Sequence, residues 1–336
     1  MSTLDIFNPQ VSVVARGLEG KIITIYGSNS LGKTKQATRL KKPYYLGFEK
    51  GLNAIAGVPF AAINSWADFK KVNKQLTHKS TVAKAREVYQ TIIFDEVEAS
   101  ARYCSKYICD KYDSDTIASG REGFGLWKEY ETAYWEEIDK LIGAGFTVVF
   151  IAHQEERKDG KIVPKGDKRA LAPVIDNSDI IVHLRSNGVD EKGKVIKSSA
   201  FFAETKDFFA RSRFDYIQTG LEEFTAEALE DAIVKAIELQ EQVEGITAVS
   251  YIQQKETLKS EVLDFDTLKA KIIEAGKFLH ANNKGDVVTE IIEDGLGKGR
   301  KVTDFTKNHI EMMVGVLDDL SDVVDEVKEK MSSKVE

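Results

Sequence analysis

The stretch that most constrains this chain is the segment Gly27–Thr34, GSNSLGKT, which has the form G-x-x-x-x-G-K-S/T. Apolar and β-branched residues over Ile22–Tyr26 predict a buried parallel strand directly before it, and residues 35–40 predict a helix after it. The two glycines let such a loop curl until successive backbone N–H groups point inward at phosphate groups, where a Cβ would not fit. Because it lies between a strand and a helix, the motif predicts nucleotide binding rather than a chance turn.

The chemistry of this phosphate loop assigns a role to its last two residues. Lys33 supplies positive charge, and the Thr34 hydroxyl is a ligand for a Mg²⁺ ion that bridges the phosphates. The N-terminus of the following helix is expected to face the same anion. The residues expected to bind ATP are Gly27, Ser28, Asn29, Ser30, Leu31, Gly32, Lys33 and Thr34.

Acidic residues follow two further predicted strands. The apolar run Thr91–Phe94 leads directly into Asp95 and Glu96, which is the pattern of a Walker B element. In that pattern Asp95 orients the Mg²⁺ ion through a water molecule, and the adjacent Glu96 can polarise the attacking water. Residues 43–48 form another short apolar run, and Glu49 stands at its carboxyl end.

A fourth buried strand is predicted over Phe146–Ala152, with His153 and Gln154 at its carboxyl tip. In an open parallel sheet the ligand lies beyond the carboxyl ends of the strands, so a polar pair there can sense the γ-phosphate of a nucleotide. The alternative is that His153 is a structural residue with satisfied hydrogen bonds, and the residues leave both interpretations open.

The next stretch, residues 155–173, has turn residues and no period. A solvated loop or hairpin explains this composition as well as a nucleic-acid-binding loop whose order depends on the nucleotide. Its six basic side chains, all candidates for contact with nucleic acid, are Arg157, Lys158, Lys161, Lys165, Lys168 and Arg169.

Two arginines, Arg211 and Arg213, are two residues apart on an extended segment and therefore face the same side. They either pair with surface acids or act as arginine fingers that reach a nucleotide across a subunit interface. Phe124–Ile142 is the clearest amphipathic helix of the chain. Its aromatic side chains could stack on bases, but their helical spacing favours packing in the core.

Composition limits the classes of partner. The net charge of −7 excludes a protein whose whole surface binds nucleic acid, so such a site must be a local basic patch. The 2 cysteines, Cys104 and Cys109, have no metal-ligand spacing and are expected to be reduced thiols. No apolar run is long enough to span a membrane, and the start of the chain lacks signal-peptide features, so we expect no membrane partner and a cytoplasmic location.

The order of the predicted elements indicates an α/β fold with a mostly parallel sheet wrapped by helices. We expect this core over residues 1–247, a polar linker over 248–262 and a small helical domain over 263–336. Helices are predicted in that last domain over residues 265–280, 286–292 and 306–330.

Taken together, the phosphate loop, Glu49, Asp95-Glu96, His153-Gln154 and the two late arginines occur in an order that resembles RecA-like P-loop ATPases. The phrase GFGLWKEYETAYWEEIDKLIGAGFTVVFIAHQEE is similar to phage nucleotide-binding proteins of the single-strand annealing and recombination kind, and the resemblance covers roughly residues 12–245.

The resemblance implies roles for several side chains. Glu49 falls where RecA-like proteins keep the glutamate that activates water, and Gln154 where a glutamine couples the γ-phosphate to a DNA-binding loop. Arg211 and Arg213 fall where paired basic residues act on the nucleotide of the neighbouring subunit. Glu96 departs from that pattern and is more like AAA-type ATPases, so either glutamate could be the catalytic base.

The sequence thus predicts a Mg²⁺-dependent ATPase that assembles on single-stranded DNA as a homo-oligomer, in a filament or a ring. It would support phage recombination, annealing or replication. Its C-terminal helices would either contact a partner such as a single-strand-binding protein or serve as a structural cap or oligomerisation element. One alternative is a P-loop kinase for a small molecule or nucleotide, and another is a binding module that holds ATP as a structural ligand.

Overall fold

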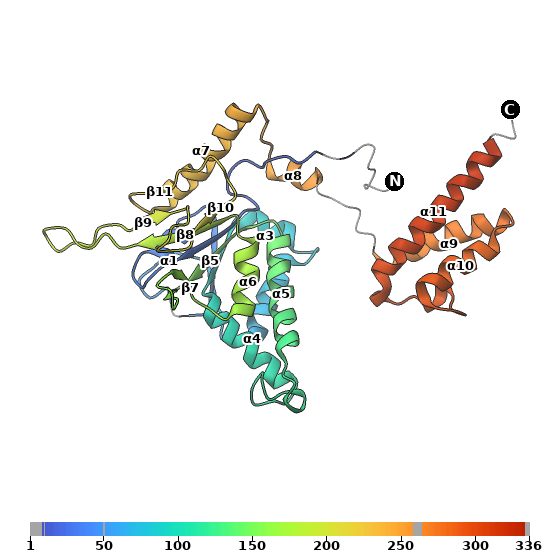
Figure 1. Ribbon diagram of the computed structural model, residues 1–336, viewed down its shortest axis with the longest axis horizontal. Helices are drawn as coiled ribbons and strands as arrows, with labels where there is room; N and C mark the ends of the chain where they lie inside the picture. Colours follow the sequence, from blue (N-terminus) through green and yellow to red (C-terminus); the bar gives the residue numbers. More distant parts are fainter. Residues whose placement is uncertain (1–8, 10, 50, 258–263, 333–336) are drawn as a thin grey trace. The chain divides into compact units, whose positions relative to one another are not determined.

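The computed structural model describes residues 9, 11–49, 51–257 and 264–332, and the chain divides into two compact units (Figure 1). The core unit is Val11–Thr257, and the helical unit consists of residues 264–332. The mixed α/β core and the helical appendage confirm the predicted fold class. Residues 1–8 of the expected core and residues 258–263 at the expected linker lie outside the described residues.

The core unit is built on a sheet whose described strands number nine, with a separate two-stranded hairpin. The sheet order is β11-β9-β8-β1-β5-β4-β2-β3, with β10 paired to β8. The strands are β1 (Ile22–Tyr26), β2 (Pro43–Gly47), β3 (Phe60–Ala62), β4 (Thr91–Asp95), β5 (Thr147–Ala152), β6 (Gln154–Glu156), β7 (Ile162–Pro164), β8 (Ile180–Arg185), β9 (Ser199–Phe201), β10 (Arg211–Ser212) and β11 (Gly220–Leu221). The helices are α1 (Lys33–Ala37), α2 (Trp66–Thr77), α3 (Val82–Val88), α4 (Val97–Lys111), α5 (Trp127–Gly143), α6 (Lys168–Asn177), α7 (Ala226–Glu244) and α8 (Tyr251–Thr257), with a 3₁₀ turn η1 (Arg121–Gly123).

The strands from β3 to β8 in the sheet order are parallel, whereas β9 and β10 are antiparallel to β8 and β11 is antiparallel to β9. Strand β5 lies between β1 and β4, in a register that pairs Ala152 with Tyr26 and Ile151 with Asp95. The residues that follow these three strands therefore emerge together at one edge of the sheet, which we call the carboxyl edge.

Alternate side chains of each central strand enter two different hydrophobic layers. Phe94 and Phe150 pack with residues of α2, α4, α5 and α6, whereas Ile93 and Val149 pack with α1 and α7 on the opposite face. Figure 1 shows α4, α5 and α6 side by side on the first face. Burial on both faces explains why these strands read as continuous apolar runs in the sequence.

The predicted central elements are confirmed within a few residues, with three corrections. Strand β3 was not predicted, because its three residues give no usable period. The helix predicted from Phe124 begins at Trp127, since Gly123 and Gly125 adopt positive φ. The helix after the phosphate loop runs over Lys33–Ala37 rather than residues 35–40.

The aromatic side chains of α5 follow the core interpretation. Tyr130 and Tyr134 are buried in the layer below the sheet, which confirms that they pack in the core. Phe124 lies in the loop before the helix and is 88% exposed, and Trp127 is partly exposed.

The helical unit contains α9 (Phe265–Ala281), α10 (Gly285–Leu296) and α11 (Ile310–Ser332), with 3₁₀ turns η2 (Val302–Asp304) and η3 (Lys307–His309). Leu268, Leu279, Met313 and Leu320 are fully or almost fully buried in its own hydrophobic core. The three helices predicted for this region are therefore present. None of the described helices is both long and apolar enough to cross a membrane.

Part of the expected linker belongs to the core unit. Helix α8 forms over Tyr251–Thr257, and the Arg86 guanidinium lies 5.2 Å from the centre of the Tyr251 ring. Upstream of it, the Val249 N–H donates to the Val14 carbonyl at 2.9 Å. These contacts tie the end of the core unit to its beginning.

Candidate nucleotide-binding and hydrolysis site

The phosphate loop leaves β1 at the carboxyl edge and is held tightly against its neighbours. Gly32 has φ 85°, a left-handed conformation that directly precedes α1. A Cβ on Gly27 would lie 2.9 Å from the Leu184 carbonyl oxygen, so the loop needs glycine there. Ser198 donates a hydrogen bond to the Leu31 carbonyl at 3.0 Å, which fixes the opposite side of the loop.

Lys33 is buried under this loop. Its Nζ donates to the carbonyl oxygens of Gly27 and Ser28 at 2.8 and 2.6 Å, so the ammonium group is folded back over the loop. Burial lowers the pKa of Lys33, while the nearby Asp95 and Glu96 carboxylates raise it. Backbone carbonyls therefore hold a buried ammonium group at the phosphate loop.

Thr34 and Asp95 meet as the sequence predicts. The Thr34 hydroxyl donates to Asp95 Oδ2 at 2.7 Å, and the Tyr45 hydroxyl donates to the same oxygen at 3.1 Å. Burial raises the pKa of Asp95, and the hydrogen bonds from Thr34 and Tyr45 and the charge of Lys33 lower it. A hydroxyl and a carboxylate in contact are the hard oxygen donors that Mg²⁺ prefers, so these residues fit the ion.

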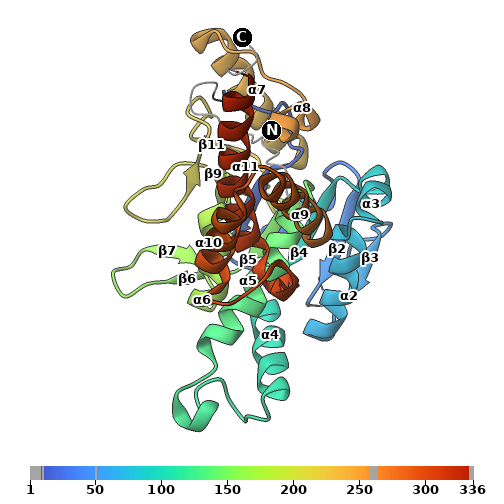
Figure 2. The ribbon, with the colours of Figure 1, turned by 90° about the vertical axis from the view of Figure 1, so that its right-hand side faces the viewer.

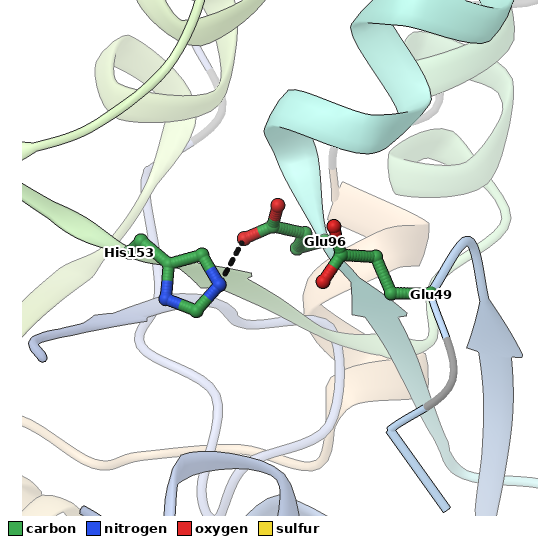
Figure 3. A group of neighbouring side chains, drawn as sticks. All are labelled: Glu49, Glu96 and His153. Atoms are coloured by element: carbon green, nitrogen blue, oxygen red, sulfur yellow. Dashed lines mark ion pairs between the residues drawn. The ribbon is translucent and has the colours of Figure 1, made fainter. Parts of the chain in front are cut away.

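Beyond Asp95, three further side chains converge at the carboxyl edge (Figure 3). One ligand atom from each of Glu49, Glu96 and His153 lies within 4.8 Å of the others. We call these three residues the carboxylate–histidine cluster. They follow β2, β4 and β5, which the sheet order places next to one another on the side of β1 where β5 lies.

Glu96 is the buried member of this cluster. Its Oε2 lies 3.1 Å from His153 Nε2, but the contact lacks hydrogen-bond geometry, so this oxygen is buried without a hydrogen-bond partner. Burial first, and then the charge of Glu49 and a hydrogen bond to it, raise the pKa of Glu96 to about 8. Burial and the charge of Lys33 lower the pKa of His153. A carboxyl group whose pKa lies near neutrality is suited to accept a proton.

The basic stretch folds into two different elements. Residues 154–164 form the β6–β7 hairpin, whose turn projects from the rest of the core unit (Figure 2), and Gln154 is its first residue. Lys168 and Arg169 belong to α6, where Asp167 is the N-cap and accepts hydrogen bonds from the N–H groups of Arg169 and Ala170. The loop predicted over residues 155–173 is therefore wrong in its second half.

The six basic side chains of this stretch differ in their contacts. Lys165 lies 3.0 Å from Glu98, Lys161 pairs with Glu204, and the Arg169 guanidinium lies 4.4 Å from the centre of the Trp127 ring. The remaining three are exposed and have no ion pair with any residue that the structure describes: Arg157, Lys158 and Lys168.

Arg211 and Arg213 lie at the opposite side of the sheet from the carboxyl edge, where the parallel strands begin. β10 pairs with the start of β8, whereas the phosphate loop follows the end of β1. Arg211 donates to the Ile175 and Ser178 carbonyls at 2.6 and 3.0 Å, and Arg213 donates to the Asp176 carbonyl at 2.7 Å. Both side chains therefore cap the C-terminus of α6 in the protomer.

Comparison with known proteins agrees with this geometry. Residues 19–214, which contain the phosphate loop, the strand-end acids and the basic stretch, match the family described as the AAA domain. The chain belongs to the AAA domain family. The SPbeta prophage-derived uncharacterized protein YorG of Bacillus subtilis (strain 168) is 64% identical to this AAA domain protein over 323 residues, which cover 96% of this chain and 99% of that protein.

Two groups of residues near this site were not expected. Tyr45 contributes a hydrogen bond to Asp95, and an ion-pair chain on α4 that includes Glu98 and Arg102 reaches Glu49. The spacing of Glu98 and Arg102, four residues apart on a helix, was a usable signal. A groove of about 820 Å³, lined in part by these two residues, Trp127 and Asp167, runs along α4, and no phosphate-loop residue lines it.

Proposed function

We propose that this AAA domain protein is a Mg²⁺-dependent ATPase that binds single-stranded DNA and supports phage recombination, single-strand annealing or replication. The observation that carries the hydrolytic part is the position of Glu96. It is buried, it follows the strand adjacent to β5, and burial with the neighbouring Glu49 raises its pKa to about 8. A base of this kind beside a phosphate loop is what water activation needs.

In this proposal the residues divide the work by position. Lys33 neutralises phosphate charge, Thr34 and Asp95 hold the metal, and Glu96 accepts the proton of the attacking water. When bound, Mg²⁺ would supply positive charge that neutralises charge developing on the phosphates. In this proposal His153 and Gln154 report the state of the nucleotide, which is supported by the contact of His153 with Glu96 and by the position of Gln154 at the start of the hairpin.

Single-stranded DNA is proposed as the partner of the basic stretch. The free cations Arg157 and Lys158 lie at the hairpin turn, and Lys168 lies at the start of α6. Phe124, whose aromatic ring is exposed, lies in the loop that precedes Trp127 and the rest of α5. Proteins that bind single strands combine such cations with aromatic rings on which bases stack.

The proposed assembly is a homo-oligomer, a filament or a ring, with ATP at the subunit interfaces. Arg211 and Arg213 lie at the edge away from their own phosphate loop, so they would reach a nucleotide only in a neighbouring protomer. The helical unit is proposed to contact a single-strand-binding protein, since it has a hydrophobic core of its own and can serve as a separate module.

One observation favours a second candidate. A P-loop kinase needs an acceptor pocket, and the groove along α4, with Glu98, Arg102 and Asp167 in its lining, is a candidate. The two functions differ in their product, since a kinase transfers the phosphoryl group to an acceptor and an ATPase releases inorganic phosphate.

The test is steady-state phosphate release with Mg²⁺ and ATP, with and without an unstructured single strand, over a salt titration. We expect the single strand to raise turnover and the increase to fade steeply with salt, because phosphate contacts release counterions. The E96Q variant serves as the control for contaminating activity. Turnover that ignores single strands at low salt would contradict the DNA part of the proposal, and loss of ATP without phosphate release would favour the kinase.

A further inference from the structure

A chain of charged side chains connects the basic hairpin to the carboxylate–histidine cluster. Lys165 Nζ lies 3.0 Å from Glu98 Oε2, and Glu98 Oε1 lies 4.0 Å from Arg102 Nη1. Arg102 Nη2 in turn lies 3.5 Å from Glu49 Oε1. The chain thus alternates in charge from Lys165 to Glu49.

Both ends of this chain meet the same cluster. Glu49 is a member of it, and the backbone N–H of Lys165 donates to the His153 carbonyl at 2.8 Å. His153 contacts Glu96, and a carboxylate oxygen of Glu96 lies within 4.8 Å of one of Glu49. The contacts therefore form a closed ring of neighbouring residues that joins the hairpin to the carboxylates of Glu49 and Glu96.

Arg102 stands between two competing acids. Its guanidinium is shared by Glu49 and Glu98, while Glu98 is shared by Arg102 and Lys165. All four side chains are partly exposed, so each pair is weak enough to exchange partners. If Lys165 turns to a phosphate group, Glu98 keeps only Arg102, and the attraction draws Arg102 away from Glu49.

We propose that Arg102 is a positioning residue that restrains Glu49 until a nucleic-acid phosphate engages Lys165. This inference rests on the proposed function and adds its regulation. With the hairpin free, Arg102 holds Glu49 in an ion pair. With Lys165 engaged, Arg102 moves to Glu98 and leaves Glu49 free beside Glu96 for water activation. Weak ion pairs of this kind shift an equilibrium by about two- to fivefold.

The variants of this ion-pair chain fall into two groups, which differ in their expected effect on turnover without and with DNA. R102Q frees Glu49 permanently, so turnover without DNA should rise about two- to fivefold and DNA should add little. K165Q leaves Glu98 with Arg102 alone, so it should raise turnover without DNA in the same way. E98Q leaves Arg102 on Glu49, so DNA should no longer raise turnover.

The experiment measures phosphate release by wild type, R102Q, R102K, E98Q and K165Q, with and without single-stranded DNA. R102K keeps the charge and should restore the ratio of stimulated to unstimulated turnover at least in part. The matched control is K106Q, one turn further along α4, since Lys106 is exposed and lies outside the chain of contacts. The KM for ATP should stay constant, because no ion pair of these four side chains with a described residue involves the phosphate loop.

Either set of outcomes decides the inference. An unchanged ratio in R102Q, or an equal loss of both rates in R102Q and R102K, would overturn it even where the wild type is stimulated by DNA. A wild type that hydrolyses ATP but ignores DNA contradicts the DNA part of the proposed function instead. In that case the inference is judged by K165Q alone, which must still raise turnover if Lys165 releases Glu49 through Glu98 and Arg102.

Discussion

The carboxyl edge of the sheet and the basic stretch that leaves it are built in opposite ways. At the edge, Lys33, Asp95 and Glu96 are buried; the register of β4 places the two acids, and the loop after β1 places the lysine. In the basic stretch, the side chains lie at the surface of a hairpin and at the first turn of a helix. Position is set by packing in the first region and by competition between ion pairs in the second.

This difference bears on how many of the basic side chains counted in the sequence are available to a partner. The strand-end residues expected at the edge lie close to one another, because a buried strand leaves its next residue little freedom. Half of the six basic side chains, in contrast, are engaged by Glu98, Glu204 or Trp127. A partner must displace those contacts, so the charge available to it is smaller than the composition suggests.

The largest effect is expected from Glu96. The E96Q change should lower kcat about 100- to 10,000-fold, because the amide cannot accept the proton of the attacking water. E49Q should have a smaller effect, since Glu49 is partly exposed and acts beside the buried base. The measurement is phosphate release under saturating ATP with both variants. Unchanged turnover in both would contradict the catalytic assignment and leave the packed edge as a binding site only.

Removal of the buried cation is the next test. K33A should weaken ATP-dependent turnover by about 100- to 1,000-fold, the usual loss when a preorganised group that stabilises phosphate charge is removed. Binding of a fluorescent ATP analogue should weaken as well. The matched control is K35A, because Lys35 is exposed two residues further along α1. Equal losses in K33A and K35A would mean that burial does not distinguish the two lysines.

The next prediction concerns a buried histidine of the core unit, and it is tested by the stability of the protein rather than by its ATPase activity. His183 on β8 lies among the rings of Tyr26 and Phe208, with neither ring nitrogen hydrogen-bonded, and burial followed by the charge of Arg185 lowers its pKa from 6.5 to about 4. Below pH 6.5 His183 is protonated in the unfolded chain, whereas in the folded chain it becomes protonated only near pH 4. The stability contribution is therefore complete above pH 6.5 and is lost as the pH falls toward 4.

The H183F variant removes this titration while keeping a ring. Between pH 7 and pH 5 the wild type should lose on the order of 2 kcal/mol more than H183F in the free energy of unfolding. Urea unfolding at the two pH values measures the difference, with H78Q as an exposed control on the same unit. Parallel losses in the wild type and H183F would show that His183 is protonated in the folded protein.

The smallest effects belong to the basic stretch, and they sharpen the contrast within it. The triple variant R157Q/K158Q/K168Q should weaken binding of a single strand about tenfold and reduce the slope of log K against log salt by about 2. K161Q should change binding less, because Lys161 already pairs with Glu204. Fluorescence anisotropy over a salt series measures both. A larger loss from K161Q would mean that the partner recruits the paired lysine first.

Much of the fold was predictable because the central strands are buried on both faces. The runs Ile22–Tyr26, Thr91–Phe94 and Phe146–Ala152 are apolar without alternation, and each became a strand of the parallel sheet. Helix α2 was predictable from its cap, since the Ser65 side chain accepts a hydrogen bond from the Asp68 N–H. Strand β3 has three residues and mixed exposure, so its sequence has no pattern that predicts a strand.

The site was predictable as a set of strand ends, but its inner contacts were not. The sequence places Asp95 and Glu96 together, yet only the sheet order brings Glu49 and His153 to Glu96. Tyr45 reaches Asp95 from the middle of β2, which no motif marks. The roles expected of Arg211 and Arg213 remain predictions, because the structure describes one protomer and places both at the C-terminus of α6.

The contact between residues 14 and 249 has a consequence for protein engineering. Since the Val249 N–H bonds to the Val14 carbonyl, the two ends of the core unit lie side by side. A unit with adjacent ends can be grafted whole into a surface loop of another protein, or circularly permuted with a short joining peptide, without threading the chain through its sheet. Permutants opened at the exposed turn of residues 189–195 would leave every strand-end residue of the carboxyl edge on its own strand.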